Sequence, residues 1–150
     1  MERFAMFSGS ILELNRHFQK VKDAEMRALG LRGSHVMPLY YLGRSPDGLT
    51  ITELAEVCKE DKAAISRAIT ELTEKGYVYR KVEEPRRVYR AKLCLTEAGE
   101  RLVQYVYTRI DFALTRGSQG LSEEQRRVFY STVELILKNL SDYNDPKSTT

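Results

Sequence analysis

Residues 61–76 read DKAAISRAITELTEKG, a segment with the signals of a helix at both of its ends. Asp61 is a favoured N-cap residue, and Gly76 is the residue type that most often follows a last helical turn. One face of this helix is apolar, with Ile65, Ala68, Ile69 and Leu72 at helical spacing. The opposite face carries Ala63, Ser66, Arg67 and Thr70. The segment therefore predicts a helix that packs on a core with one face and presents the other to a partner.

A shorter helix is expected directly before this one. Thr50 and Glu53 have the spacing of a capping box, and the polar residues 59–61 interrupt the apolar pattern after about two turns. Upstream, Val36–Leu42 is apolar and aromatic, and residues 45–48 (SPDG) have strong turn chemistry. Two helices joined by a tight turn make a helix-turn-helix.

A basic two-stranded hairpin is expected next, from Tyr77–Val82 and Val88–Leu95, with residues 83–87 as its tip. Residues 80–92 hold six basic and two acidic side chains, a net charge of +4, whereas the whole chain carries +3. All the net positive charge is therefore assigned to this hairpin. Such asymmetry fits a polyanion-binding element, although a solvated hairpin without a partner fits the charge equally well.

Helices flank this central lobe on both sides. Before it, about Ile11–Met26 has apolar residues at helical spacing; after it, Thr96 caps a helix at about Glu97–Thr115, and Ser122 and Gln125 open a last one. The expected fold class is mainly α with a small two-stranded β-wing, a winged helix-turn-helix.

This arrangement points to double-stranded DNA as the partner. The major groove of B-DNA admits one α-helix, whose outward face reads the base edges. Arginine bonds guanine bidentately, serine and threonine bond phosphate or base, and alanine permits close approach. We expect Ala63, Ser66, Arg67 and Thr70 to form this face, with Lys59 and Lys62 as phosphate contacts. The alternative role of Arg67 is an ion pair with Glu71, four residues later on the same helix.

Four short runs, in order, resemble the MarR family of bacterial regulators: Leu49-Thr50 with Glu53-Leu54-Ala55, then residues 61–67 (DKAAISR), residues 72–78 (LTEKGYV) and residues 95–99 (LTEAG). The resemblance extends over nearly the whole chain. It implies one domain over 1–150, with a winged lobe at 34–96 and dimerisation helices at 8–30 and 97–142. It also implies a homodimer that places two recognition helices in successive major grooves of a pseudo-palindromic operator.

The wing departs from the family pattern. The family commonly has an aspartate–arginine pair at the tip, whereas this chain has residues 83–90 (EEPRRVYR), about two residues longer. Which of Arg86, Arg87 and Arg90 enters the minor groove is left open; we favour Arg87, with Arg86 close behind.

The resemblance also implies a small-molecule pocket, phenolic or similar in its ligand, between the dimer helices and the DNA-binding lobe. Met37, Tyr40 and Tyr41 are candidates to line it, together with His17, although a place in the core is the simpler role for the aromatic cluster. Relatives that sense oxidants do so through a cysteine in the first helix, and the first cysteine here is Cys58. Cys58 and Cys94 are therefore expected to be structural.

Other classes of function find little support in the sequence. No Ser/His/Asp or Cys/His arrangement and no Gly-rich phosphate loop points to an enzyme. His17 and His35 fall on different predicted helices without thiols or carboxylates at signature spacing, so neither a metal nor another cofactor is expected. No apolar run approaches the roughly 18 residues of a membrane span, no secretory segment is evident, and two cysteines suit a reducing cytoplasm.

The sequence thus predicts a cytoplasmic transcriptional regulator, with repression as the expected sign of control. The alternative is a winged-helix module for protein–protein contact whose basic wing binds an acidic partner.

Overall fold

The computed structural model describes residues 1–81 and 91–144 of the chain. The chain divides into two compact units, Met1–Ala113 and Leu114–Thr150. Its elements, in order, are α1 (Glu2–Arg27), the 3₁₀ helix η1 (Gly33–His35), α2 (Val36–Gly43), α3 (Ile51–Cys58), α4 (Lys62–Glu74), β1 (Val78–Lys81), β2 (Lys92–Leu95), α5 (Glu97–Gly117) and α6 (Glu123–Asn144). The expected fold class is confirmed, since the described chain is mainly helical with one two-stranded antiparallel sheet.

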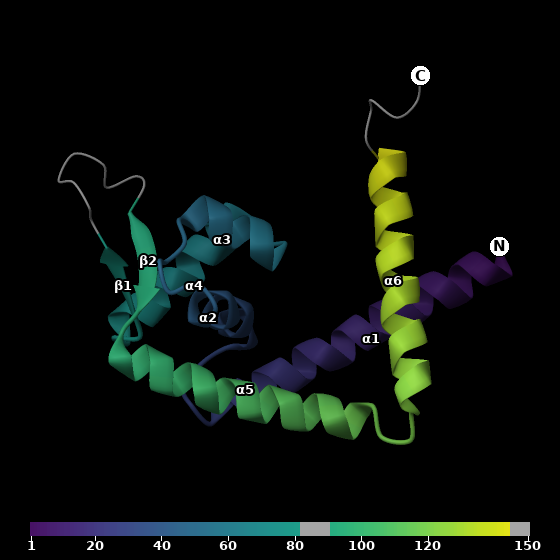
Figure 1. Cartoon of the computed structure of the whole chain (residues 1–150), viewed down its shortest axis with the longest axis horizontal. Coiled ribbons are helices and arrows are strands. Elements are labelled where there is room, and N and C mark those ends of the chain that lie inside the picture. The colour runs from purple at the N-terminus through teal and green to yellow at the C-terminus, as the bar shows by residue number, and fades with distance from the viewer. Residues whose placement is uncertain (82–90, 145–150) are drawn as a thin grey trace. The chain divides into compact units, whose positions relative to one another are not determined.

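The core of the first unit lies among α2, α3, α4 and the sheet, which Figure 1 shows gathered side by side. The predicted apolar face of α4 is buried, and Ile69 and Leu72 are fully enclosed. Leu39 of α2, Leu54 of α3 and Leu93 of β2 meet them in the same cluster. Burial of these aliphatic side chains fixes the inner face of α4, which leaves its other face outward.

The helix ends follow the capping signals in the sequence. Thr50 and Glu53 form both bonds of a capping box: Glu53 N–H donates to Thr50 Oγ1 at 3.2 Å, and Thr50 N–H donates to Glu53 Oε2 at 2.8 Å. Asp61 Oδ1 accepts from Ala64 N–H at 2.8 Å and caps α4. Gly76 follows α4 with φ 77°, a left-handed conformation that a glycine adopts without a Cβ clash.

The two strands pair from Val78↔Leu95 to Lys81↔Lys92. A single bridge between Leu49 and Leu93 joins the segment before α3 to β2. The described strands are shorter than the expected ones, and the rest of the expected hairpin, residues 82–90, lies outside the described residues. The sheet follows α4 directly in the chain, as the sequence predicts.

Two features of the N-terminal region differ from expectation. Helix α1 begins at Glu2 rather than near Ile11, because residues 2–10 contain no proline and the single Gly9 does not interrupt the helix. Met1 supplies no side-chain cap, so no capping signal marks the true start. The 3₁₀ turn η1 was also not expected; it carries the chain from α1 into α2.

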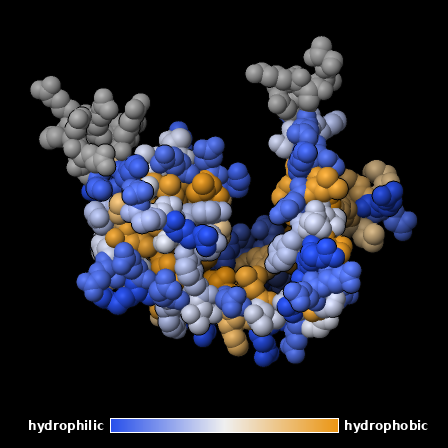
Figure 2. All heavy atoms as spheres, viewed as in Figure 1, coloured by the Kyte–Doolittle hydropathy of each residue, from blue (hydrophilic) through white to orange (hydrophobic). Residues whose placement is uncertain are grey.

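The second unit contains α6. Ser122 and Gln125 form the predicted capping box, with Gln125 N–H donating to Ser122 Oγ at 3.1 Å and Ser122 N–H donating to Gln125 Oε1 at 2.8 Å. No residue of α6 is buried within the single chain. Its large apolar side chains are exposed, as the orange surface over this helix in Figure 2 shows: Val128, Phe129, Leu135, Leu137 and Leu140. None of the helices in the described ranges is both long and apolar enough for a membrane span.

Candidate nucleic-acid interface

Helices α3 and α4 and the turn between them form the helix-turn-helix. The turn is held by Lys59, which has a left-handed backbone at φ 57° and ψ 38°. Its N–H donates to Glu56 O at 3.3 Å, and the next residue, Glu60, donates to Ala55 O at 3.1 Å. Because Asp61 caps α4 directly after this turn, the connection between the two helices is short. The direction of α4 relative to α3 is thereby fixed.

The outward face of α4 carries the four residues expected there. Ala63, Arg67 and Thr70 are exposed, and Ser66 is half-buried. The Thr70 hydroxyl donates to Ser66 O at 2.9 Å, so its proton is used within the helix. Thr70 therefore offers a methyl group and an acceptor oxygen to a partner, whereas Arg67 offers a guanidinium that has no ion pair within the described residues.

The alternative role of Arg67, an ion pair with Glu71, is not what the structure shows. The Glu71 carboxylate instead binds Arg32 Nη2 at 2.9 Å and His35 Nε2 at 3.0 Å. Arg32 and His35 precede α2, so Glu71 joins α4 to a segment far away in sequence. Arg67 is left available for another partner.

Further cations lie on the neighbouring turn and on the sheet. Lys59 and Lys62 are exposed at the turn and at the first residue of α4. Arg80 and Lys81 are exposed on β1, and Lys92 lies opposite Lys81 in the sheet register. Sequence reasoning included Arg80, Lys81 and Lys92 in the basic segment but nominated none of them as a contact; the strand register is the observation that brings Lys81 and Lys92 together. Arg86, Arg87 and Arg90 lie outside the described residues.

The four candidate ligand-binding residues fall in two places. His17 is exposed on α1, with Glu13 Oε1 at 4.0 Å from its Nε2. Met37, Tyr40 and Tyr41 are half-buried on α2, where the Tyr40 ring lies 5.4 Å from that of Tyr107 on α5. The Tyr107 hydroxyl donates to Tyr40 O at 2.9 Å. Burial is the main cause that raises the pKa of Tyr107, which keeps this donor protonated. The α2 aromatics thus pack against α5, and the structure places no contact between them and His17 in the described chain.

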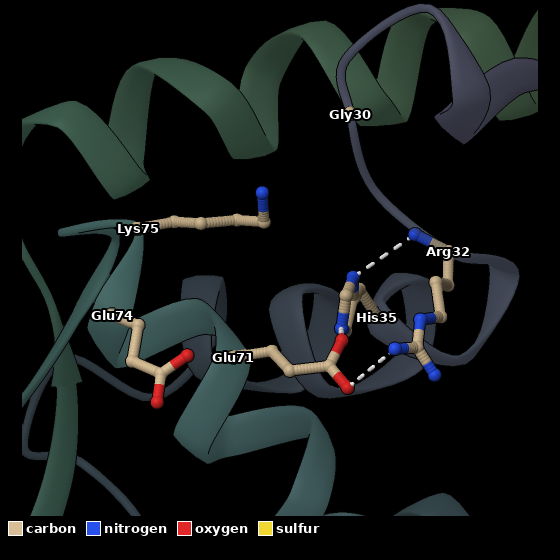
Figure 3. Close-up of a pocket in the computed structure, with 6 residues that line it drawn as sticks. All are labelled: Gly30, Arg32, His35, Glu71, Glu74 and Lys75. Carbon is tan, nitrogen blue, oxygen red and sulfur yellow. Dashed lines mark hydrogen bonds and ion pairs between the residues drawn. The ribbon is translucent and has the colours of Figure 1, made fainter.

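An open pocket of about 480 Å³ lies elsewhere, at the C-terminal end of α4 (Figure 3). Its lining contains none of the four candidates: Gly30, Arg32, His35, Glu71, Glu74 and Lys75. The His35 side chain is buried. Its bond to Glu71 was not foreseen, because the two residues are 36 positions apart. Burial is the largest cause that lowers the pKa of His35 below 6.5.

The two cysteines are free and buried, as expected. Burial raises the pKa of the Cys58 thiol to about 11, so it stays protonated and poorly nucleophilic at neutral pH. In the described part of the chain, no three His, Cys, Asp or Glu side chains come together as metal ligands would.

Comparison with known proteins shows what this chain is similar to. Residues 29–87 match the model of the MarR family. A MarR-family transcriptional regulator from Silicibacter pomeroyi is 25% identical, with 93% of this chain and 94% of that one covered and a TM-score of 0.75. The MepR–DNA complex of S. aureus is 21% identical over 89% and 96% of the two chains, with a TM-score of 0.78. A MarR-family regulator from Listeria monocytogenes, complexed with a 26mer DNA, is also 21% identical, over 89% and 87%, with a TM-score of 0.76.

Proposed function

We propose that this chain is a transcriptional regulator of the MarR type that binds double-stranded DNA with sequence specificity, since residues 29–87 match the model of that family. The observation that carries the proposal is the outward face of α4, where Arg67, which has no ion pair within the described residues, lies among three small side chains. Two solved structures that share this fold hold DNA, and this likeness supports the same partner here.

The proposed contacts divide into two groups. Ala63, Ser66, Arg67 and Thr70 read base edges in the major groove from the N-terminal and middle turns of α4. Cations around them bind phosphate or enter the minor groove without reading a full base code: Lys59, Lys62, Arg86, Arg87 and Arg90. Phosphate contacts of this kind supply most of the affinity and little of the specificity.

The register of the sheet supports a polyanionic partner for the wing. Lys81 and Lys92 are directly opposite each other where the strands lead into residues 82–91. Like charges in such a cross-strand pair destabilise a hairpin. The phosphates of a DNA backbone beside the hairpin would offset this repulsion. In a wing without a partner, the repulsion would remain uncompensated.

We further propose that the protein acts as a homodimer through residues 8–30 and 97–142, with residues 34–96 as the DNA-binding lobe. The support is the exposed apolar surface of the helices in the single chain. On α1 it consists of Phe4, Phe7, Ile11, Leu14 and Phe18, and on α6 of Phe129, Leu137 and Leu140, among others. Surfaces of this size and character mark interfaces. Sedimentation equilibrium should give a dimer, and a monomer at micromolar concentration would overturn this part of the proposal.

Two finer roles complete the proposal. The regulator represses transcription in the cytoplasm, where its two free, buried cysteines suit a reducing environment. A phenolic or similar small molecule that contacts His17, Met37, Tyr40 and Tyr41 would change the distance between the two recognition helices and release the operator. A titration with a broad phenolic library that leaves operator affinity unchanged would remove the effector from the proposal.

The central experiment selects the preferred site from a random duplex pool and measures its affinity as a function of salt. A palindromic site is expected. If a dimer makes about 6–10 phosphate contacts, affinity should fall by about 10³–10⁵-fold between about 50 and 200 mM salt. A flat salt response, or equal binding of all duplexes, would favour the protein–protein module instead.

A further inference from the structure

His35 ends η1, the turn before α2; its Nδ1 bonds within that turn and its Nε2 bonds to α4. The side chain is 1% exposed, and its Nδ1 accepts from Arg32 N–H at 3.1 Å. Its Nε2 lies 3.0 Å from Glu71 Oε2 on α4 (Figure 3). Because Nδ1 accepts, the proton of the neutral ring lies on Nε2, which donates to Glu71. The geometry therefore selects one tautomer of the neutral imidazole.

A second proton on this ring breaks one of the two bonds. It adds an N–H at Nδ1, directly opposite the Arg32 N–H, so that two donors face each other. The bond from Nε2 to Glu71 remains. The charged ring also competes with Arg32 for the Glu71 carboxylate, whose Oε1 binds Arg32 Nη2 at 2.9 Å. Protonation thus opens the η1 turn that positions the ring against Glu71, and it redistributes the charge around Glu71.

The position of this cluster (Arg32, His35 and Glu71) links it to DNA reading. Glu71 lies one turn after Arg67 on α4, so a shift of Glu71 moves the reading face. On the other side, Gly33 N–H donates to Asp23 Oδ1 of α1 at 2.9 Å, which holds the same segment to α1. The cluster therefore sets how α4 stands relative to α1.

The charges facing His35 act in opposite directions. Glu71 favours the protonated ring, whereas Arg32 and Lys75 disfavour it. Two further carboxylates lie around this turn. Glu74 lines the same pocket, and Asp23 of α1 accepts from Gly33 N–H. Burial is the largest influence and opposes the proton, so the neutral ring is the resting form at neutral pH.

We infer that His35 is a positioning residue for α4: its neutral ring holds the recognition helix in the DNA-reading orientation, and its protonation weakens operator binding. This inference rests on the proposed function and adds a regulation by acid. The expected change in operator affinity, a loss on acidification, is opposite to the general effect of acid, because added positive charge on a protein strengthens its binding to a polyanion.

The test measures the affinity of the purified full-length protein for the duplex selected at about pH 8, from that pH down to about pH 5, at constant salt. Affinity should fall on acidification by at most about tenfold per pH unit for each protomer, since one proton is taken up. His17→Gln, which removes the other histidine, should behave as the wild type. His35→Gln keeps a donor toward Glu71 and does not titrate, so its affinity should stay level or rise with acid.

Two charge variants test the cause, because a structural role alone does not shift a midpoint. Glu71→Gln removes the group that favours the proton, so the midpoint of the affinity loss should move to lower pH. Lys75→Gln removes a cation that disfavours the proton, so the midpoint should move to higher pH. Both variants alter single side chains that are not fully buried, and NMR titration of the His35 ring should give the same midpoints in the absence of DNA.

The outcomes separate the two proposals. Wild-type affinity that is level or rises on acidification, with binding intact at about pH 8, overturns the role of His35 and leaves the proposed function standing. Equal midpoints in Glu71→Gln and Lys75→Gln overturn it as well. Failure to select any duplex at about pH 8 overturns the proposed function itself, and with it any regulation of DNA binding.

Discussion

Gly99 of α5 packs directly against the carbonyl oxygen of Tyr77, so closely that a Cβ atom at position 99 would overlap that oxygen. Thr96 secures the same junction: its hydroxyl donates to Gly76 O at 2.7 Å and accepts from Gly99 N–H at 3.1 Å. Residues 76 and 77 follow α4 and lead into β1. The start of α5 is therefore fastened to the end of α4 through backbone groups, which explains in physical terms why glycine occupies position 99.

Replacement of this glycine should destabilise the first unit. In Gly99→Ala the methyl group meets backbone atoms that have little room to move, and overpacking of this kind costs about 1–3 kcal/mol. Urea unfolding followed by circular dichroism measures the loss. Gly117→Ala is the matched control on the same helix, because a Cβ there meets nothing within 4 Å, and it should change stability by less than about 0.5 kcal/mol. Equal effects of the two substitutions would contradict the close packing.

Lys59 should be a site where stability and DNA affinity move in opposite directions. Its left-handed backbone strains a residue with a Cβ, and glycine relieves that strain, so Lys59→Gly should gain about 0.5–1 kcal/mol of unfolding free energy after its entropy loss. The same substitution removes a proposed phosphate contact. Affinity should then fall for all duplexes alike, and the salt slope should decrease by about 1.

The matched control for that prediction is Lys62→Ala at the first residue of α4. Lys62 has an ordinary helical backbone and a similar exposed charge, so the substitution should weaken DNA binding without a gain in stability. A gain in stability for both variants would mean that repulsion among lysines, rather than backbone strain, explains the effect of Lys59→Gly.

The capping box of α3 should give the protein a measurable acid dependence. The bond from Thr50 N–H is the largest cause that lowers the pKa of Glu53 below 4.5. A carboxylate whose pKa is lowered on folding contributes stability above its unfolded pKa, and this contribution is lost as the pH falls through the folded value. The difference in urea midpoint between wild type and Glu53→Gln should therefore shrink as the pH falls below 4.5. A difference that stays constant through this range would contradict the role of the ionised carboxylate.

Local signals in the sequence predicted most of the winged helix-turn-helix. Thr50, Asp61 and Gly76 act within a few residues of themselves, so their capping roles were readable without a structure. The apolar face of α4 was readable for the same reason. Helix α1 was placed too late in the chain because Met1 makes no side-chain cap and apolar periodicity alone marks no start.

The polar contacts between distant segments were not predictable in this way. Arg67 lies four residues before Glu71 on the same helix, so the sequence alone suggested an ion pair between the two as the alternative role of Arg67. The fold instead brings His35 and Arg32 to Glu71. A hydrogen bond to the buried His35 ring stabilises the fold more than an exposed ion pair with Arg67 would, because exposed ion pairs contribute little to stability. The roles assigned to Ser66, Arg67 and Thr70 and to the wing arginines stay predictions.

Arg67 and Arg87 should differ in how their loss affects binding. Arg67 is exposed on the outward face of α4 and has no ion pair within the described residues, so Arg67→Ala should cost about 1–3 kcal/mol on the preferred site and relax specificity at one base pair in each half-site, as expected for the proposed bidentate contact to guanine. Arg87→Ala, in the wing, should weaken binding to all duplexes and lower the salt slope. Arg101→Ala on α5 is the control, because that exposed arginine pairs with Glu97 and belongs to neither group of proposed contacts, and its affinity should match the wild type. Competition binding against a set of single-base variants of the selected duplex separates the outcomes. If Arg67→Ala and Arg87→Ala lose affinity equally across that set, the two arginines have the same role and the outward face of α4 does not read bases through Arg67.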